Sequence, residues 1–418
     1  MVTLAAITEA AQLLRGKIIR TPLVYSPTFS AMTGAEVFLK LETMQKAGSF
    51  KVRGATNRIL SKRSEIGKNG VIAASAGNHA QGVAVAAGIA GVPATIVMPV
   101  WVSPSKQEAT AGYGATIILE GSSLQGSIEY AMALAESGDM TFIHPYDDEA
   151  VITGQGTIGL EILEDLPDVD AVIAPVGGGG LIAGIATAVR ESMPAVRIIG
   201  VQASVCPSAV DALRAGEPVT IESEPTVADG IRVTRTGILT FPVIHDLIEE
   251  VVLVDDDEIV SAILALLERK KVLAEGAGAA PLAALLSGKV PYREGEKIVL
   301  VIGGGNVDAF LFEKILRKGL FEAGRIMQCI VELFEGAGSL SALLTLLARE
   351  GGVITRVEQE RGSADLPLLI VRVALELEVR SRDHQEWILS ALREEGYEVI
   401  PIRVPHYSFF EFYHTIGG

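Results

Sequence analysis

Short apolar runs alternate with helix-like stretches along the first 320 residues, and this alternation is the feature that most constrains the fold. The runs at 71–74 and 171–176, for example, are each followed by glycines and then by a helical pattern. Such alternation predicts a parallel sheet with helices on both faces, and ligands then bind at the carboxyl ends of the strands. The strands expected in this α/β part are 71–74, 94–98, 116–119, 171–176, 198–201 and 298–302.

The pattern changes near residue 320, in keeping with a chain of 418 residues that is too long for one ordinary core. The elements expected in the second part run strand, helix, strand, strand, helix, strand, at 325–333, 339–350, 353–359, 368–379, 384–395 and 398–402. That order is typical of a ferredoxin-like βαββαβ module. We therefore predict one domain over 1–320, a linker at 318–324 and a second domain over 325–418. These patterns leave the aromatic-rich tail 406–414 unexplained.

Charge and cysteine content exclude several classes of protein. The formal net charge of −16 argues against a nucleic-acid or anionic-membrane partner, because phosphates would be repelled. Cys206 and Cys329 lie far apart and without a His cluster, which argues against a disulfide framework or a zinc site. Gly, Pro and polar residues interrupt the uncharged stretches 71–105 and 171–189, so buried strands and helices explain them better than membrane spans. No signal-peptide pattern is present, and a cytoplasmic protein is expected.

Three glycine-containing segments carry candidate chemistry. Residues 46–55 read KAGSFKVRGA, and a lysine that loses its proton, here Lys51, can form a Schiff base with an aldehyde cofactor. Residues 75–82 read SAGNHAQG and precede a predicted helix, whose first backbone N–H groups can hold a carboxylate. The four glycines 177–180 follow a predicted strand, and their amides can approach a phosphate closely. A solvated lysine, a plain helix cap and a tight turn are the alternatives.

Taken together, the motifs resemble those of one family. The order SFKVRGA, SAGNHAQG, GGGGLIAG, EGAGAA (275–280) and GGGNVD (303–308) resembles the fold-type II pyridoxal-phosphate enzymes, specifically the threonine dehydratases, or threonine ammonia-lyases. The resemblance extends over about 18–320. It implies two open twisted α/β subdomains, the smaller at about 41–149, pyridoxal 5′-phosphate as cofactor, and a homodimer or homotetramer. The absence of a Walker or GxGxxG pattern disfavours ATP and dinucleotides.

The resemblance also implies roles for single residues. Lys51 is the residue that bonds to the cofactor and later the base at the substrate Cα, Phe50 packs on the cofactor ring, and Asn78 bonds the 3′-hydroxyl. The cofactor-binding residues implied are Phe50, Lys51, Asn78, Gly177, Gly178, Gly179, Gly180, Glu275 and Gly303. The residues implied to line the substrate-carboxylate pocket are Ser75, Ala76, Gly77 and His79.

The implied reaction removes water and then ammonia from L-threonine and gives 2-oxobutanoate. Serine would give pyruvate by the same steps. Discrimination between the two substrates rests on about one methyl group, worth roughly 1–3 kcal/mol, so secondary activity on L-serine is expected.

The sequence departs from its relatives at several positions. Family members usually place Ser or Cys at the position of Gly303 to meet the pyridine nitrogen, and glycine offers no side chain for that contact. Related serine racemases hold a divalent cation with acidic residues where this chain has Gln202, Cys206 and Ser208, so no metal of that kind is predicted. Racemases also carry a second serine, as a proton donor, where this chain has Ala76, which disfavours racemisation.

The C-terminal module resembles an ACT domain, a small fold that binds amino acids at paired interfaces. The resemblance rests on EGAGSL at 335–340, a turn into an amphipathic helix, and on the Gly351-Gly352 pair. The effector-binding residues that it implies are Gly336, Ala337, Gly338, Ser339 and Leu340. Isoleucine or valine is the expected effector, because threonine dehydratase opens the route to isoleucine. A purely structural dimerisation module is the alternative.

Two other functions stay open at the level of sequence. One is a catalytically silent amino-acid sensor, which the intact Lys51, Asn78 and glycine tetrad disfavour. The other is a serine-preferring dehydratase, or another β-eliminating enzyme of the same fold. The absorption of a bound cofactor tests the first, and substrate kinetics test the second.

Overall fold

The structure is a computed structural model that describes residues 2–361 and 366–402. Contacts divide the chain into two units, Met1–Leu311 and Phe312–Gly418. Helix α13 (Ala309–Glu322) continues through most of the predicted linker at 318–324, because buried Ile315 and Gly319 keep the helical spacing up to that point. The chain leaves the helix at Gly324, whose φ is +71°. The aromatic tail 406–414 lies outside the described residues.

The larger sheet of the first unit has the strand order β1-β2-β10-β7-β8-β9, and every neighbouring pair except β1–β2 is parallel. All five residues of β7 are buried, as expected for a parallel sheet that is covered on both faces. The strands are β1 (Leu23–Tyr25), β2 (Glu36–Leu41), β7 (Ala171–Pro175), β8 (Arg197–Ala203), β9 (Glu250–Val254) and β10 (Lys297–Ile302).

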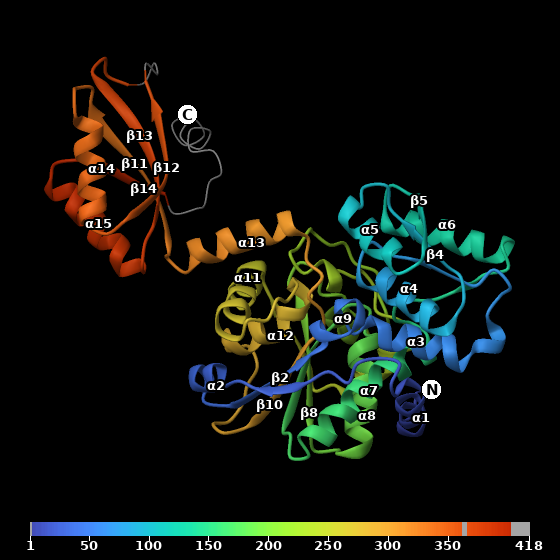
Figure 1. The fold of residues 1–418 in the computed structure, drawn as a ribbon. Coiled ribbons are helices and arrows are strands. Elements are labelled where there is room, and N and C mark those ends of the chain that lie inside the picture. Colours follow the sequence, from blue (N-terminus) through green and yellow to red (C-terminus); the bar gives the residue numbers. More distant parts are fainter. Residues whose placement is uncertain (1, 362–365, 403–418) are drawn as a thin grey trace. The chain divides into compact units, whose positions relative to one another are not determined.

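Helices cover both faces of this sheet (Figure 1). On one face α7 and α8 pack so closely that a Cβ on Gly184 would lie 2.4 Å from the Ile152 carbonyl oxygen. On the other face α12 contacts β7, β8, β9 and β10. The helices of this part are α1 (Leu4–Leu14), α2 (Pro27–Thr33), α7 (Glu149–Asp165), α8 (Gly180–Ser192), α9 (Ser208–Ala215), α10 (Thr240–Leu247), α11 (Asp256–Ala265) and α12 (Gly276–Leu286).

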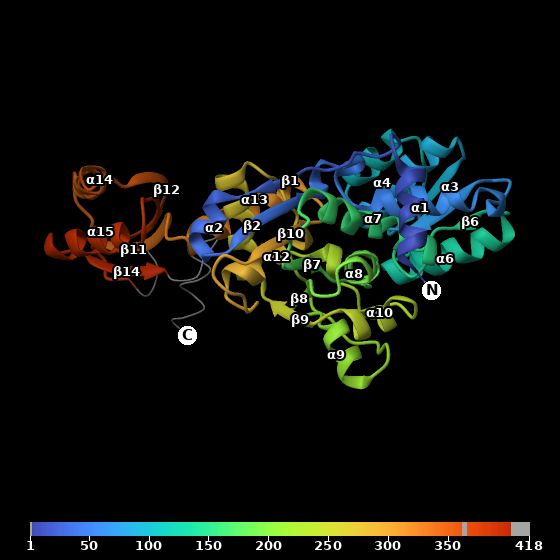
Figure 2. The ribbon, with the colours of Figure 1, turned by 90° about the horizontal axis from the view of Figure 1, so that it is seen from below.

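The chain leaves the larger sheet after β2, builds a smaller parallel sheet of order β5-β4-β3-β6, and returns through α7. Ala73 and Ile96 face the α4 side of this sheet, whereas Ile72 and Val97 face α6. Its elements are β3 (Val71–Ala74), β4 (Ala94–Met98), β5 (Thr116–Leu119), β6 (Thr141–Phe142), α3 (Lys51–Ser61), α4 (Asn78–Ala90), α5 (Pro104–Gly112) and α6 (Leu124–Ser137). Figure 2 shows α3, α4 and α6 around this part of the chain.

The second unit contains an antiparallel sheet of order β12-β13-β11-β14. Its core contains Cys329 and Leu375 from the sheet with Leu343 and Ile388 from the two helices. The elements are β11 (Ile326–Phe334), α14 (Ser339–Arg349), β12 (Val353–Glu360), β13 (Ile370–Glu378), α15 (Arg382–Glu394) and β14 (Glu398–Ile402). The predicted α/β part and the predicted βαββαβ module are therefore both confirmed. Across 2–361 and 366–402, none of the helices is long and apolar enough to cross a membrane.

Candidate active site

The four glycines form the loop between β7 and α8, at the carboxyl edge of the larger sheet. Gly179 has φ +95°, a conformation that any Cβ would strain. A Cβ on Gly178 would lie 2.4 Å from the ring of Tyr146, and one on Gly180 would lie 2.9 Å from the carbonyl oxygen of Tyr146. Helix α8 begins without a side-chain cap. The loop is thus closely packed, and it presents uncapped backbone N–H groups at the start of a helix.

Lys51 is the first residue of α3, and the preceding backbone is tied to the larger sheet because the Phe50 N–H donates to the Gly303 carbonyl oxygen at 3.0 Å. The Lys51 amino group donates to the carbonyl oxygen of Pro145 at 2.9 Å and lies 5.2 Å from the centre of the Phe50 ring. Burial lowers the pKa of Lys51 to about 8, although Glu275 in its ionised form would oppose this. The neutral form, which a nucleophile or base requires, is therefore far more populated at neutral pH than in an ordinary lysine.

Asn78 joins three of the sequence motifs in one hydrogen-bonded cluster. Its Nδ2 donates to Glu275 Oε1 at 2.6 Å, and its Oδ1 accepts from Asn306 Nδ2 at 2.8 Å. Burial, with a smaller effect of Asp229, raises the pKa of Glu275 to about 8, although the bond from Asn78 opposes this. Glu275 therefore carries a proton at neutral pH, and the cluster presents little net charge.

The segment from Ser75 to His79 connects β3 to α4. Ser75 Oγ accepts from the Gly77 N–H at 3.1 Å, and a Cβ built on Gly77 would meet no atom within 4 Å, so open space adjoins the motif. Ala76 is half-buried beside it. The ring of His79 is bonded to the Ile143 carbonyl oxygen at 2.8 Å, and burial lowers the pKa of His79 to about 3. That imidazole is neutral and directed into the protein, so His79 offers its backbone N–H rather than its ring.

Residues 143–148 contact Lys51, His79 and the glycine loop, although the sequence analysis did not single them out. Besides the bonds to Lys51 and His79 through the carbonyls of Pro145 and Ile143, this segment packs Tyr146 on the glycine loop. Asp147 accepts from the N–H groups of 238 and 239, which precede α10. The sequence signal that marks this segment is IHPYDD, which combines turn residues with an aromatic residue directly after a strand.

Two positions bear on the departures from the family pattern. A Cβ on Gly303 would lie 3.4 Å from the nearest atom, in the Phe50 ring, so a small side chain would fit where none is present.

The second position is that of the cation in related enzymes. Here Gln202 Oε1 accepts from the Ala209 N–H at 2.9 Å, and Gln202 Nε2 donates to Ser208 Oγ at 3.2 Å. Within the part of the chain that the structure describes, no three His, Cys, Asp or Glu residues form a metal-binding group.

The sequence profile of the pyridoxal-phosphate dependent enzymes matches residues 14–304. The chain belongs to this family. An L-threonine ammonia-lyase of Thermotoga maritima is 46% identical over 399 residues, which cover 96% of this chain and 99% of that protein. A catabolic L-threonine dehydratase of Escherichia coli K12 is 46% identical over 303 residues, 72% of this chain and 92% of that protein.

Solved structures of this pyridoxal-phosphate dependent family have the same fold. Maize serine racemase superposes with a TM-score of 0.71 at 37% identity, over 77% of this chain and 98% of that one. The processed form of threonine deaminase isoform 2 from Solanum lycopersicum superposes with a TM-score of 0.71 at 36% identity, over 75% of this chain and 93% of that one. The family, the fold class and the cofactor expected from the sequence are confirmed.

The site fits pyridoxal phosphate on two structural observations. The glycine loop packs so closely on Tyr146, Thr240 and Ile244 that added Cβ atoms would clash, so the loop itself offers only backbone groups to a ligand. Among the described residues, the buried hydroxyls of Ser49, Thr56 and Thr236 have no hydrogen-bond partner. Ser49 precedes Phe50, and Thr236 precedes Gly237, whose N–H donates to the Gly178 carbonyl oxygen. Buried hydroxyls without partners are costly, so two of the three lie where a bound polar group could supply one.

The predicted effector segment lies in the second unit and is an exposed turn between β11 and α14. Gly336, Ala337 and Gly338 are exposed, and Gly338 has φ +90°. Ser339 and Leu340 begin α14, which has no side-chain cap. The turn therefore leaves the first backbone N–H groups of that helix accessible.

Proposed function

We propose that this chain is a threonine ammonia-lyase that removes water and then ammonia from L-threonine to give 2-oxobutanoate. The observation that carries the proposal is the position of Lys51, whose amino group has a lowered pKa and lies where the glycine motifs converge. Relatives that cover nearly the whole chain are L-threonine ammonia-lyases, which supports the same substrate.

When bound, pyridoxal phosphate supplies an aldehyde that bonds to amines and a ring that accepts the electron pair left at the substrate Cα. Lys51 would hold the cofactor through its amino group, and the same amino group would serve as the base that takes the proton from the substrate Cα. The Pro145 carbonyl oxygen accepts a hydrogen bond from this amino group at 2.9 Å, which restricts its position.

The remaining residues bind and orient. The N–H groups of Gly177 to Gly180 and the start of α8 would hold the phosphate, and the ring of Phe50 would support the cofactor ring. One Nδ2 hydrogen of Asn78 bonds to Glu275, and the other would be available to the 3′-oxygen of the cofactor. The uncapped start of α4, with Ser75, Ala76, Gly77 and the backbone of His79, binds the substrate carboxylate.

The reaction is tested by mixing the purified protein with pyridoxal phosphate and L-threonine and measuring 2-oxobutanoate. Lys51→Ala should form no product. Lys46→Ala should be as active as the parent, because within the described residues the Lys46 side chain bonds only to the Lys17 carbonyl oxygen. L-serine should give pyruvate at a lower rate. A bound cofactor without product from threonine would point to another β-elimination substrate, and no bound cofactor would favour the silent sensor.

For the C-terminal module we propose that isoleucine or valine binds at the turn 336–340 in a homodimer or homotetramer. The support is the accessible helix start after Gly338, which suits a carboxylate. Gly336→Asp places a negative charge in the turn, and its Cβ would lie 3.4 Å from the nearest atom, Ser339 Oγ. Gly336→Ala adds the same Cβ without the charge and is the matched control. Calorimetric titration should show binding to the parent and to Gly336→Ala but not to Gly336→Asp. No binding of either amino acid to the parent would remove the proposal.

A further inference from the structure

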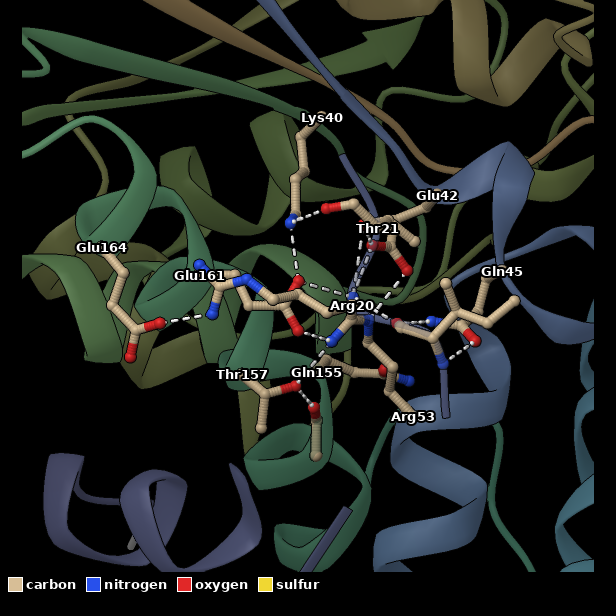
Figure 3. Close-up of polar contacts among 12 residues, drawn as sticks. Arg20, Thr21, Lys40, Glu42, Gln45, Arg53, Gln155, Thr157, Glu161 and Glu164 are labelled. Carbon is tan, nitrogen blue, oxygen red and sulfur yellow. Dashed lines mark hydrogen bonds and ion pairs between the residues drawn. The ribbon is translucent and has the colours of Figure 1, made fainter. Parts of the chain in front are cut away.

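Four charged side chains are buried together around Arg53 of α3 (Figure 3). The side chains of Lys40, Glu42 and Arg53 are 0% exposed, and that of Glu161 is 13% exposed. None of the steps above uses them. Two cations and two carboxylates balance, so the cluster is neutral as a whole.

Arg53 occupies the centre of this cluster. Its Nε and Nη2 donate to the two oxygens of Glu42, both at 2.8 Å, and its Nη1 and Nη2 donate to the two oxygens of Glu161 at 2.7 and 2.9 Å. Lys40 Nζ donates to Glu161 Oε2 at 2.6 Å and to the Thr21 carbonyl at 2.7 Å. Each of the two carboxylates binds the planar guanidinium through a pair of hydrogen bonds, which restricts the orientation of the guanidinium as well as its position.

The partners of Arg53 come from both places where the chain passes between the two sheets. Glu42 lies in the short helix η1 (Glu42–Met44) directly after β2, and Glu161 lies on α7, through which the chain returns. Helix α3 also crosses α7 in backbone contact, since a Cβ on Gly154 would lie 2.7 Å from the Arg53 carbonyl oxygen. Glycine packing sets the distance between the two helices, and the ion pairs restrict rotation and sliding.

Stability alone does not explain such a cluster. Four buried ions lose their hydration, and well-packed apolar residues of similar volume often stabilise a protein equally well. Apolar contacts, however, have no preferred direction, whereas the paired hydrogen bonds of the guanidinium to two carboxylates fix the rotation of α3 about its own axis. Two residues along an α-helix turn the side-chain direction by about 200°, so Arg53 holds the back of the helix turn whose front carries Lys51.

We propose that Arg53 is a positioning residue: by binding Glu42 and Glu161 it fixes the rotation of α3 and thereby places the Lys51 amino group for proton transfer. The inference rests on the proposed role of Lys51. It concerns placement and not chemistry, since Arg53 is on the far side of the helix from the reacting atoms.

The test uses a charge-balanced variant, Arg53→Met/Glu42→Gln, which leaves Lys40 and Glu161 as a neutral pair. The variant should bind pyridoxal phosphate and unfold at about the parent temperature, because no charge is left unpaired. Its kcat for threonine should fall about tenfold or more while KM changes by less than about threefold, because misplacement acts on the chemical step. The circular dichroism of the visible cofactor band, which reports the orientation of the bound ring, should change.

Arg197→Met is the matched control. Arg197 also binds two carboxylates, those of Glu249 and Glu296, but at the amino end of β8, away from the site. This variant should lose thermal stability and keep its kcat and its cofactor band. Arg53→Lys keeps the positive charge but loses the paired hydrogen bonds to Glu42 and Glu161, so it should also lower kcat. If the double variant does not fold, Arg53→Lys provides the test.

A folded double variant with parental kcat and parental circular dichroism would overturn the proposal. So would a fall in kcat that only matches a fall in bound cofactor, because that result indicates a structural role. If the parent protein forms no 2-oxobutanoate, the proposed function fails, and the cofactor band still reports whether Arg53 positions Lys51.

Discussion

Replacing Glu275 by Gln should stabilise the cofactor-free protein, and the gain should grow with pH. The Glu275 side chain is buried, and its pKa is raised from the ordinary 4.5 to about 8, chiefly by burial. A raised carboxyl pKa contributes stability that is complete below pH 4.5 and is lost as pH rises towards 8, because the unfolded chain releases the proton first. Gln resembles the protonated acid and has no proton to lose.

The size of the effect follows from the shift. Each pKa unit corresponds to about 1.4 kcal/mol, so Glu275→Gln should raise the free energy of unfolding by about 1 kcal/mol at pH 5 and about 3 kcal/mol at pH 7 relative to the parent. Urea titrations at the two pH values measure this difference. The only tryptophans are Trp101 and Trp387, so a Trp387→Phe background makes the emission report the first unit.

An equal gain at pH 5 and pH 7 would refute the reasoning, because it would mean that Glu275 ionises in the folded state as it does in the unfolded state. Glu161→Gln is a control of opposite sign. Burial works to raise the pKa of Glu161, but Arg53 and Lys40 outweigh burial and lower it. Its ionised form therefore stabilises the fold at neutral pH, and Glu161→Gln should destabilise it there, with a smaller loss as pH falls.

Three further predictions concern the cofactor loop, the pyridine edge and metals. Gly178→Ala should weaken cofactor affinity about tenfold or more, because its Cβ would lie 2.4 Å from Tyr146 and overpacking costs about 1–3 kcal/mol. A fluorescence titration with the cofactor measures this affinity, and a parental value would contradict the prediction. Gly303→Ser should fold with a parental melting temperature, because its Cβ meets Phe50 at an ordinary 3.4 Å; a large thermal shift would show that the space is not available. Chelation of divalent cations should leave the rate of 2-oxobutanoate formation unchanged. At the position where related enzymes bind a cation, the Gln202 side chain is already bonded to the start of α9. A loss of activity that added Mg²⁺ restores would contradict this prediction.

Local patterns were enough to find the motifs. The glycines of 177–180 and the residues after β3 lie where a strand meets a helix, and strand and helix periods are properties of neighbouring residues. Lys51 follows a Gly-Ser-Phe turn, but that local pattern left a solvated lysine as the alternative, and its role was predicted from the order of all the motifs together. The strands that were predicted lie within about two residues of the observed ones, a margin typical of frayed ends. The sequence analysis missed β1, β2, β6 and β9 of the first unit.

What the neighbours of these motifs do was decided by the tertiary structure. The ring of His79 turns inward to a carbonyl of a segment that lies more than sixty residues away, and Pro145 and Tyr146 reach Lys51 and the glycine loop from that same segment. The buried ions around Arg53 likewise come from 40–42 and 161, and no spacing in the sequence relates them. A pattern in the sequence records which face of an element is apolar, whereas the pKa of Lys51 and the fixed angle of its helix depend on charges and carbonyls that only folding brings within a few ångströms.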